Sequence, residues 1–281
     1  MAQNRGFTLV EVVVALVLTG LATAAIGSAL LTGLRSYTRQ IDRGQVRADL
    51  RTATAIFTRE LRGLDACGGD IVEMQESTIT YRAQRGTHFV CTQPNPSTGA
   101  VVVFETPSAG LRQLETGRDS LLLLAENDVV DPNDDEWIPL GLGGVSTGTL
   151  CPGGQNGLRL DLLGASARHL SGVYRGAVAL GFQVTKILLY SASDGRYWIG
   201  LREFRPDNGW TITQPILGPV SRNGLRFRYY RADGSVAENQ SSVALISVEI
   251  VRVGNLPAGS HSAAVRDSMT IHVGLRNNPG F

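Results

Sequence analysis

The chain opens with a long apolar segment. Between Phe7 and Leu34 the only charged residue is Glu11, and a short polar leader, residues 1–6, comes before it. At about 1.5 Å per residue, the uncharged part from Val12 to Leu34 gives roughly 35 Å of helix, which exceeds the about 30 Å of a bilayer's hydrocarbon core. The pattern therefore predicts a membrane-spanning helix over residues 7–34.

The helical period continues after the sequence becomes polar at Arg35. Apolar residues recur at spacings of three and four, opposite a charged face; they are Val46, Leu50, Ala53, Phe57, Leu61 and Leu64. We expect this stripe to pack on a sheet and the helix to continue through residues 35–64. Two helices broken near Gly33 are the alternative. The run Cys67-Gly68-Gly69 is typical of a helix C-terminus.

Residues 65–281 carry the alternating patterns of strands, separated by turns such as Asp194-Gly195 and Asp233-Gly234. The expected strands are 78–82, 88–92, 101–104, 157–163, 179–190, 197–204, 225–230, 243–253 and 269–275. A run of strands behind one helix predicts an α+β fold: a spine helix packed on a mostly antiparallel β-sheet head. Residues 131–148 are expected to form a loop that could divide the head into two lobes.

Composition adds little chemistry. The formal net charge of the 281 residues is +1, which excludes strong bulk attraction to nucleic acid or anionic lipid. The four histidines are scattered, and neither an H-E-x-x-H nor a G-x-S-x-G pattern occurs. We therefore expect no catalytic residues, no cofactor and no small-molecule substrate. Arg226, Arg228 and Arg231 alternate along one strand, but we interpret them as a solvated face and expect no nucleic acid partner.

An acidic turn is the one candidate for a metal. Asp131, Asn133 and Asp135 alternate as oxygen ligands do in calcium loops. An EF-hand, however, needs glycine where Glu136 stands and a bidentate acid where Leu142 stands. We expect a solvated turn and no metal, with calcium as the weaker alternative.

The acid at the front of the apolar segment needs an explanation, because a charge inside a membrane helix is costly and by default has a partner. The stretch Gly6-Phe7-Thr8-Leu9-Val10-Glu11 resembles the prepilin signature of type IV pilins and type II secretion pseudopilins. The resemblance implies that a prepilin peptidase cuts after Gly6 and N-methylates Phe7. It also implies that Glu11 pairs with the terminal amine of a neighbouring subunit. The alternatives are an ordinary secretory signal cut after Ala24 and a Glu11 that only reaches the interface.

Two further features refine the resemblance: the first departs from the pattern of major pilins, and the second extends the likeness to minor members. Many major pilins have a proline in this helix, whereas none occurs between Phe7 and Leu34. The order of the patterns 197–202, 225–230 and 242–253 is similar to that of PilW-like minor pilins and, more distantly, of pseudopilin J. The resemblance implies a minor pilin that primes or caps a type IV pilus, or a pseudopilin of a type II secretion system. A membrane-anchored extracytoplasmic adhesin or binding module is the alternative from another class.

The expected partners follow from that resemblance. They are the prepilin peptidase, other major and minor pilins, the pilus assembly platform and the cytoplasmic (inner) membrane. The resemblance implies that the membrane is crossed once, with the head outside the cytoplasm, before the subunit joins a filament.

The three cysteines are Cys67, Cys91 and Cys151, an odd number that prevents complete internal pairing. A head outside the cytoplasm permits a disulfide. We favour Cys67 with Cys91, which would fasten the helix end to the sheet. Cys91 with Cys151 is the second choice, and three free thiols are the third.

Overall fold

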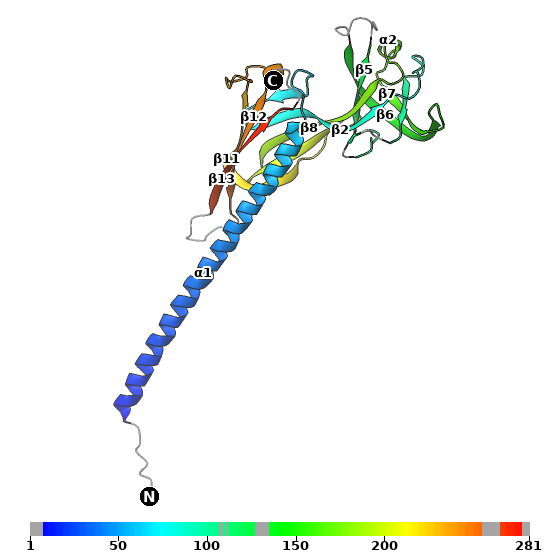
Figure 1. Ribbon diagram of the computed structural model, residues 1–281. Helices are drawn as coiled ribbons and strands as arrows, with labels where there is room; N and C mark the ends of the chain where they lie inside the picture. The colour runs from blue at the N-terminus through cyan, green and yellow to red at the C-terminus, as the bar shows by residue number, and fades with distance from the viewer. Residues whose placement is uncertain (1–7, 107–108, 111, 127–134, 255–264, 277–281) are drawn as a thin grey trace.

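The structure, a computed structural model, describes residues 8–106, 109–110, 112–126, 135–254 and 265–276. One long helix, α1 (Leu9–Arg62), leads into a β-rich head that also holds the short helices α2 (Ala167–Ser171) and η1 (Gln240–Ser242). Figure 1 shows the first half of α1 projecting away from the head. The strands are β1 (Ile71–Met74), β2 (Thr78–Phe89), β3 (Ala100–Phe104), β4 (Ala109–Gly110), β5 (Ser120–Ala125), β6 (Glu136–Leu150), β7 (Asn156–Leu163), β8 (Val178–Ser191), β9 (Tyr197–Arg205), β10 (Gly209–Trp210), β11 (Gln214–Tyr230), β12 (Leu245–Val253) and β13 (Arg266–Gly274).

The described strands form one 13-stranded sheet in the order β13-β12-β11-β9-β8-β5-β6-β7-β3, with β1, β2, β4 and β10 attached beside this path. Each pair of neighbouring strands is antiparallel. The second half of α1 packs on β11, β12 and β13. The prediction of an α+β fold with a long helix on an antiparallel sheet is therefore confirmed.

One hydrophobic core lies between α1 and the sheet. All six residues of the predicted stripe are buried in it, each with at most 3% of its surface exposed. The ring of Phe57 lies 6.1 Å from that of Phe227 on β11. We call this part, the second half of α1 with β1, β9, β10, β11, β12 and β13, the first lobe. The continuous helix confirms the stripe and excludes a break near Gly33.

A second core lies further from α1. Its residues come from β3, β5, β6, β7, α2 and the start of β8, and they include Leu121, Leu142 and Leu160. We call these elements the second lobe. Figure 1 shows them gathered at the side of the head away from α1, with β2 and β8 running between the two lobes. β2 and β8 pair from Thr78 to Phe89 and so belong to both lobes.

The loop expected at residues 131–148 is wrong for most of its length, and residues 131–134 lie outside the described residues. Residues 136–150 form β6, a strand of the second lobe. The glycines of this strand interrupt the alternation of apolar and polar residues by which a strand is predicted. Two of them are required by packing, because a Cβ on Gly143 would lie 2.7 Å from Leu163 and a Cβ on Gly144 would lie 2.9 Å from Asp161. The pattern at 78–82 and the start of the pattern at 88–92 fall in one strand, because β2 runs without a turn from Thr78 to Phe89, whereas residues 90–92 lie beyond its end.

The C-terminus of α1 also differs from the prediction. The helix ends at Arg62 with Gly63 as its C-cap, before the Cys67-Gly68-Gly69 run. The side chain of Asp65 accepts a hydrogen bond from Gly68 N (2.9 Å), and that of Asp70 accepts one from Asp65 N (2.9 Å). These side chains offer the backbone a turn that competes with further helix.

The favoured disulfide, Cys67 with Cys91, is wrong. Cys91 is bonded to Cys151, 60 residues later, and the exposed Cys67 is a free thiol that donates to Ser241 O (3.4 Å). Cys91 follows the end of β2 in the second lobe, and Cys151 follows β6 in the same lobe. Cys67 belongs to the turn after α1, so it cannot reach them.

Candidate functional site

The first turn of α1 is closed by a reciprocal pair of hydrogen bonds. Thr8 is the N-cap, and its hydroxyl accepts from Glu11 N (3.3 Å). The Glu11 carboxylate in turn accepts from Thr8 N (3.4 Å) and from the Thr8 hydroxyl (3.5 Å). Such a capping box satisfies backbone donors that a helix start leaves unpaired, and a carboxylate is favoured at this positive end of the helix. Glu11 is therefore held at the tip of α1. Gly6 and Phe7 lie outside the described residues.

After this turn, the surface of the first half of α1 is apolar and is not covered by any other described part of the protein. Its most apolar stretch is long enough to cross a membrane, and no residue of that stretch is buried in the protein. The exposed apolar side chains include Leu9, Leu16, Leu21, Leu30 and Leu34. So large an apolar surface is stable only in lipid or against other apolar surfaces.

The hydroxyl groups in this half of α1 are adapted to such surroundings. Thr19, Thr23 and Thr32 each donate to the carbonyl oxygen four residues earlier, at 2.8–2.9 Å. Ser28 donates to Ala25 O at 2.8 Å. Polar groups in hydrocarbon must be satisfied internally, and these bonds satisfy them. Glu11 is the one ionisable side chain between Leu9 and Leu34.

The second half of α1 is fixed to the head by buried charges. Arg252 on β12 is only 2% exposed, and its Nε and Nη2 both donate to Asp49 Oδ2, at 3.0 and 2.8 Å. Its Nη1 donates to Pro219 O at 2.8 Å. One arginine therefore ties the helix to two strands.

A second buried group lies near the end of α1. The Glu60 carboxylate accepts from the Tyr81 hydroxyl (3.3 Å) and from Arg85 Nη1 (3.3 Å), both on β2. Burial, followed by the negative charge of Glu60, raises the pKa of Tyr81 well above its usual value. The Tyr81 hydroxyl therefore stays protonated and remains a donor. Together with the bonds of Arg252, the contacts of Glu60 restrict rotation of the head about the helix.

The other predicted site residues are not brought together. Asp131 and Asn133 lie outside the described residues, and Asp135 is exposed. In the part of the chain that the structure describes, no group of three His, Cys, Asp or Glu could hold a metal ion. Arg226 forms an ion pair with Glu76 (2.7 Å), which reduces the positive charge of that strand.

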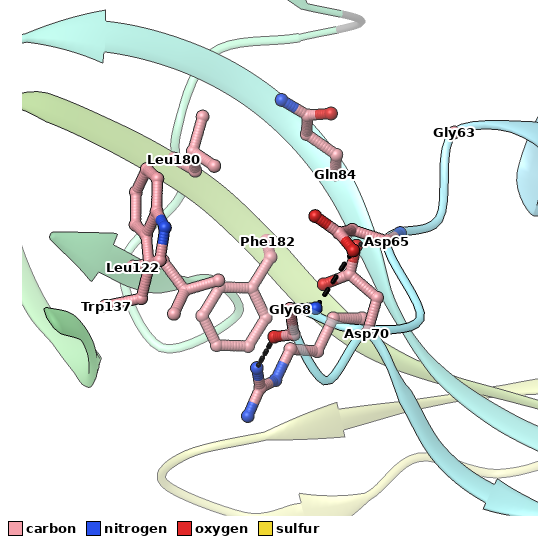
Figure 2. A pocket seen from close by; sticks show the side chains of 10 residues that line it. Gly63, Asp65, Gly68, Asp70, Gln84, Leu122, Trp137, Leu180 and Phe182 are labelled. Carbon is pink, nitrogen blue, oxygen red and sulfur yellow. Dashed lines mark hydrogen bonds between the residues drawn. The ribbon is translucent and has the colours of Figure 1, made fainter. Parts of the chain in front are cut away.

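A pocket of about 140 Å³, which was not predicted from the sequence, lies where the turn after α1 meets both lobes. Figure 2 shows Asp65 and Asp70 on one side of it and Leu122, Trp137 and Phe182 on the other. Burial raises the pKa of Asp70 to about 6, although the hydrogen bond from Asp65 and the attraction of Arg82 lower it. The signal in the sequence was two acids around a Gly-Gly pair, which we interpreted only as a helix end.

Comparison with known proteins bears on the N-terminus. Residues 1–27 match the prokaryotic N-terminal methylation motif, a span that includes Gly6, Phe7 and Glu11. No curated protein and no solved structure matches the chain. The motif and the bare apolar half of α1 together support a type IV pilin-like or pseudopilin protein that is anchored in a membrane.

Proposed function

We propose that this chain is a minor pilin, a non-enzymatic subunit that primes or caps assembly of a type IV pilus after its leader is removed. The observation that supports it most is the division of α1. The first half is bare and apolar and follows the methylation motif, whereas the second half is locked to a β-rich head. Such a helix suits a subunit that leaves lipid for the core of a filament, with its head outside the cytoplasm.

Processing would complete the site at the tip of α1. Cleavage between Gly6 and Phe7 by the prepilin peptidase would leave Phe7, N-methylated and still cationic, one residue before the N-cap Thr8. The capping box already holds the Glu11 carboxylate at that end of the helix. A carboxylate in a low-dielectric medium is costly alone and strongly attracted to a cation. The terminal amine of a neighbouring subunit supplies that cation and fixes the axial stagger of the two helices.

The unbroken helix supports a minor rather than a major subunit. No proline interrupts α1, which runs as one element over 54 residues. A pseudopilin of a type II secretion system would share this anchor and the same processing. The proteins that copurify with the chain decide between the two machines.

Replacing Glu11 tests the pairing. Glu11→Ala should insert into the membrane and be cleaved after Gly6 as the wild type is, because the charge has gone from lipid and the peptidase motif around Gly6 is intact. It should fail to copurify with filament subunits. An exposed acid of the head, Glu76→Ala, is the matched control and should copurify normally.

Crosslinking adds a positional readout. A cysteine placed beside Glu11, in a Cys67→Ser background that removes the free thiol, should crosslink to the N-terminal segment of a neighbouring subunit. Normal copurification of Glu11→Ala would rule out the pairing. A mature N-terminus at Ala25 would rule out the pilin proposal altogether.

A further inference from the structure

The pocket between the turn after α1 and the two lobes has two unlike walls. One wall is the turn itself, with the carboxylates of Asp65 and Asp70; the other is formed by Leu122, Trp137 and Phe182. Figure 2 shows the carboxylates facing the aromatic side chains across the pocket. A site with negative charge on one side and apolar rings on the other suits an alkyl chain that ends in a cation.

The carboxylates keep acceptor capacity for such a ligand. Asp65 Oδ1 accepts from Gly68 N, and Asp70 Oδ2 accepts from Asp65 N. The second oxygen of each carboxylate has no hydrogen-bond partner among the described residues. Among the described residues of the wall, Arg82 is the one cation; it donates to Gly68 O (3.3 Å) and lies over the ring of Phe182 (5.5 Å). Two acids against one arginine give these described residues one net negative charge.

The size of the pocket limits the ligand. A cavity of about 150 Å³ holds a benzene-sized molecule, and this one measures about 140 Å³. One long side chain fits, whereas a folded segment does not. Trp137 is 40% exposed at the rim and directly follows the exposed acids Asp135 and Glu136. A cation is attracted to the face of a tryptophan ring, and tryptophan is enriched among the residues that contribute most to binding at interfaces.

We propose that this pocket receives a basic side chain from a neighbouring filament subunit, with its cation on the two carboxylates and its alkyl stem against the aromatic rings. The identity of the partner rests on the proposed function, whereas the chemistry of the site does not. A single side chain binds weakly in isolation. Subunits held side by side by their membrane helices have a high effective concentration, at which weak contacts are occupied. A free cation in solution lacks this advantage.

The chemistry is tested with n-butylguanidinium on the full-length protein in detergent micelles. The indole N–H signal of Trp137, assigned by its loss in Trp137→Phe, should shift saturably, and neutral N-butylurea should cause no shift. Asp70→Asn and Asp65→Asn keep the hydrogen bonds of the turn and should each weaken binding about tenfold or more, since a hydrogen bond to a charged group contributes about 1.5–3 kcal/mol. Asp233→Asn, in an exposed turn of the first lobe, is the matched control and should bind as the wild type does.

The partner is tested in cells with a photo-crosslinking amino acid at position 137. We expect a crosslink to a filament subunit at a lysine- or arginine-containing peptide, and we expect Asp70→Asn to abolish it. Absence of any shift with n-butylguanidinium would overturn the proposed site without touching the pilin proposal, which Glu11→Ala tests separately. If n-butylguanidinium binds but the crosslinks are unchanged in Asp70→Asn, the proposed partner is wrong, and the pocket binds a free cationic ligand instead.

Discussion

Arg252 of β12 and Asp49 of α1 are 203 residues apart in the chain, yet two nitrogens of the arginine donate to one oxygen of the aspartate. The arginine is almost fully buried and the aspartate partly so. Breaking a buried ion pair by removing one partner costs much more than the pair gains over an apolar substitute, because the remaining charge stays buried. This asymmetry leads to a prediction about the attachment of the helix.

Asp49→Ala should lower the free energy of unfolding of the head by about 3–5 kcal/mol, measured by denaturant titration of the full-length protein in detergent. The double variant Asp49→Leu with Arg252→Met should recover most of that loss. Arg47→Ala is the control, because its pair with Asp267 is 68% and 40% exposed and such pairs contribute about 0–1 kcal/mol. Equal losses of stability in Asp49→Ala and Arg47→Ala would contradict the prediction.

Cys91→Ser should destabilise the second lobe, and Cys151→Ser should do so equally. The disulfide spans 60 residues, for which a chain-entropy treatment gives about 4 kcal/mol. Cys67→Ser should leave stability unchanged, because this thiol is exposed and free. Peptide mapping without reduction checks the pairing, and a mapped link from Cys67 to Cys91 would refute it.

Asp70→Asn should stabilise the protein at neutral pH. The folded pKa of Asp70 is raised to about 6 from 3.8, so the folded state binds the proton more tightly than the unfolded state. This contribution is fully present below about pH 4 and is lost as the pH rises through 6. The asparagine variant should therefore gain about 1–2 kcal/mol at pH 7.5, after allowance for partial exposure, and almost nothing at pH 4.

Denaturant midpoints at the two pH values measure this difference. Asp233→Asn is a control of opposite sign, because hydrogen bonds from Ser235 lower the pKa of Asp233. A gain for Asp70→Asn that is the same at both pH values would show that its titration is not the cause.

Gly181→Ala should destabilise the junction between the lobes. A Cβ at this position would overlap the side chain of Leu114, and such overpacking costs about 1–3 kcal/mol. The added variant Leu114→Ala should relieve the overlap, so the double variant should lose less than the sum of the single losses. Gly274→Ala, with nothing within 4 Å of its Cβ, should be near neutral. Additive losses in thermal unfolding would contradict this explanation.

The parts of the fold that local pattern dictates could be predicted, and those that long-range placement dictates could not. The period of Val46 to Leu61 identified the buried face of α1 because each residue faces the same way in any continuous helix. β6 was missed because its glycines remove the alternating side chains by which strands are identified. The predicted disulfide pairing was wrong because the spacing of cysteines along the chain does not reveal which lobe holds each cysteine.

The candidate site divides in the same way. Glu11 could be singled out because a charge in an apolar helix is conspicuous in the sequence itself. The pocket beside Asp70 could not, because its walls come from the turn after α1, β2, β5, β6 and β8. Nothing short of the folded sheet brings Trp137 opposite Asp65.

The two strands shared by both lobes also determine how the head carries tension. A force that pulls on the second lobe while α1 is held runs lengthwise along β2 and β8, whose inter-strand hydrogen bonds lie across the strands. Because both strands continue into both lobes, such a pull is carried by the two backbones and does not have to break these bonds, whereas a strand at the edge of a sheet can be peeled off one bond after another. The overlap from Thr78 to Phe89 therefore joins the lobes through two covalent chains. The head should resist a steady pull at the second lobe far better than a sideways peel of β3 from the opposite edge.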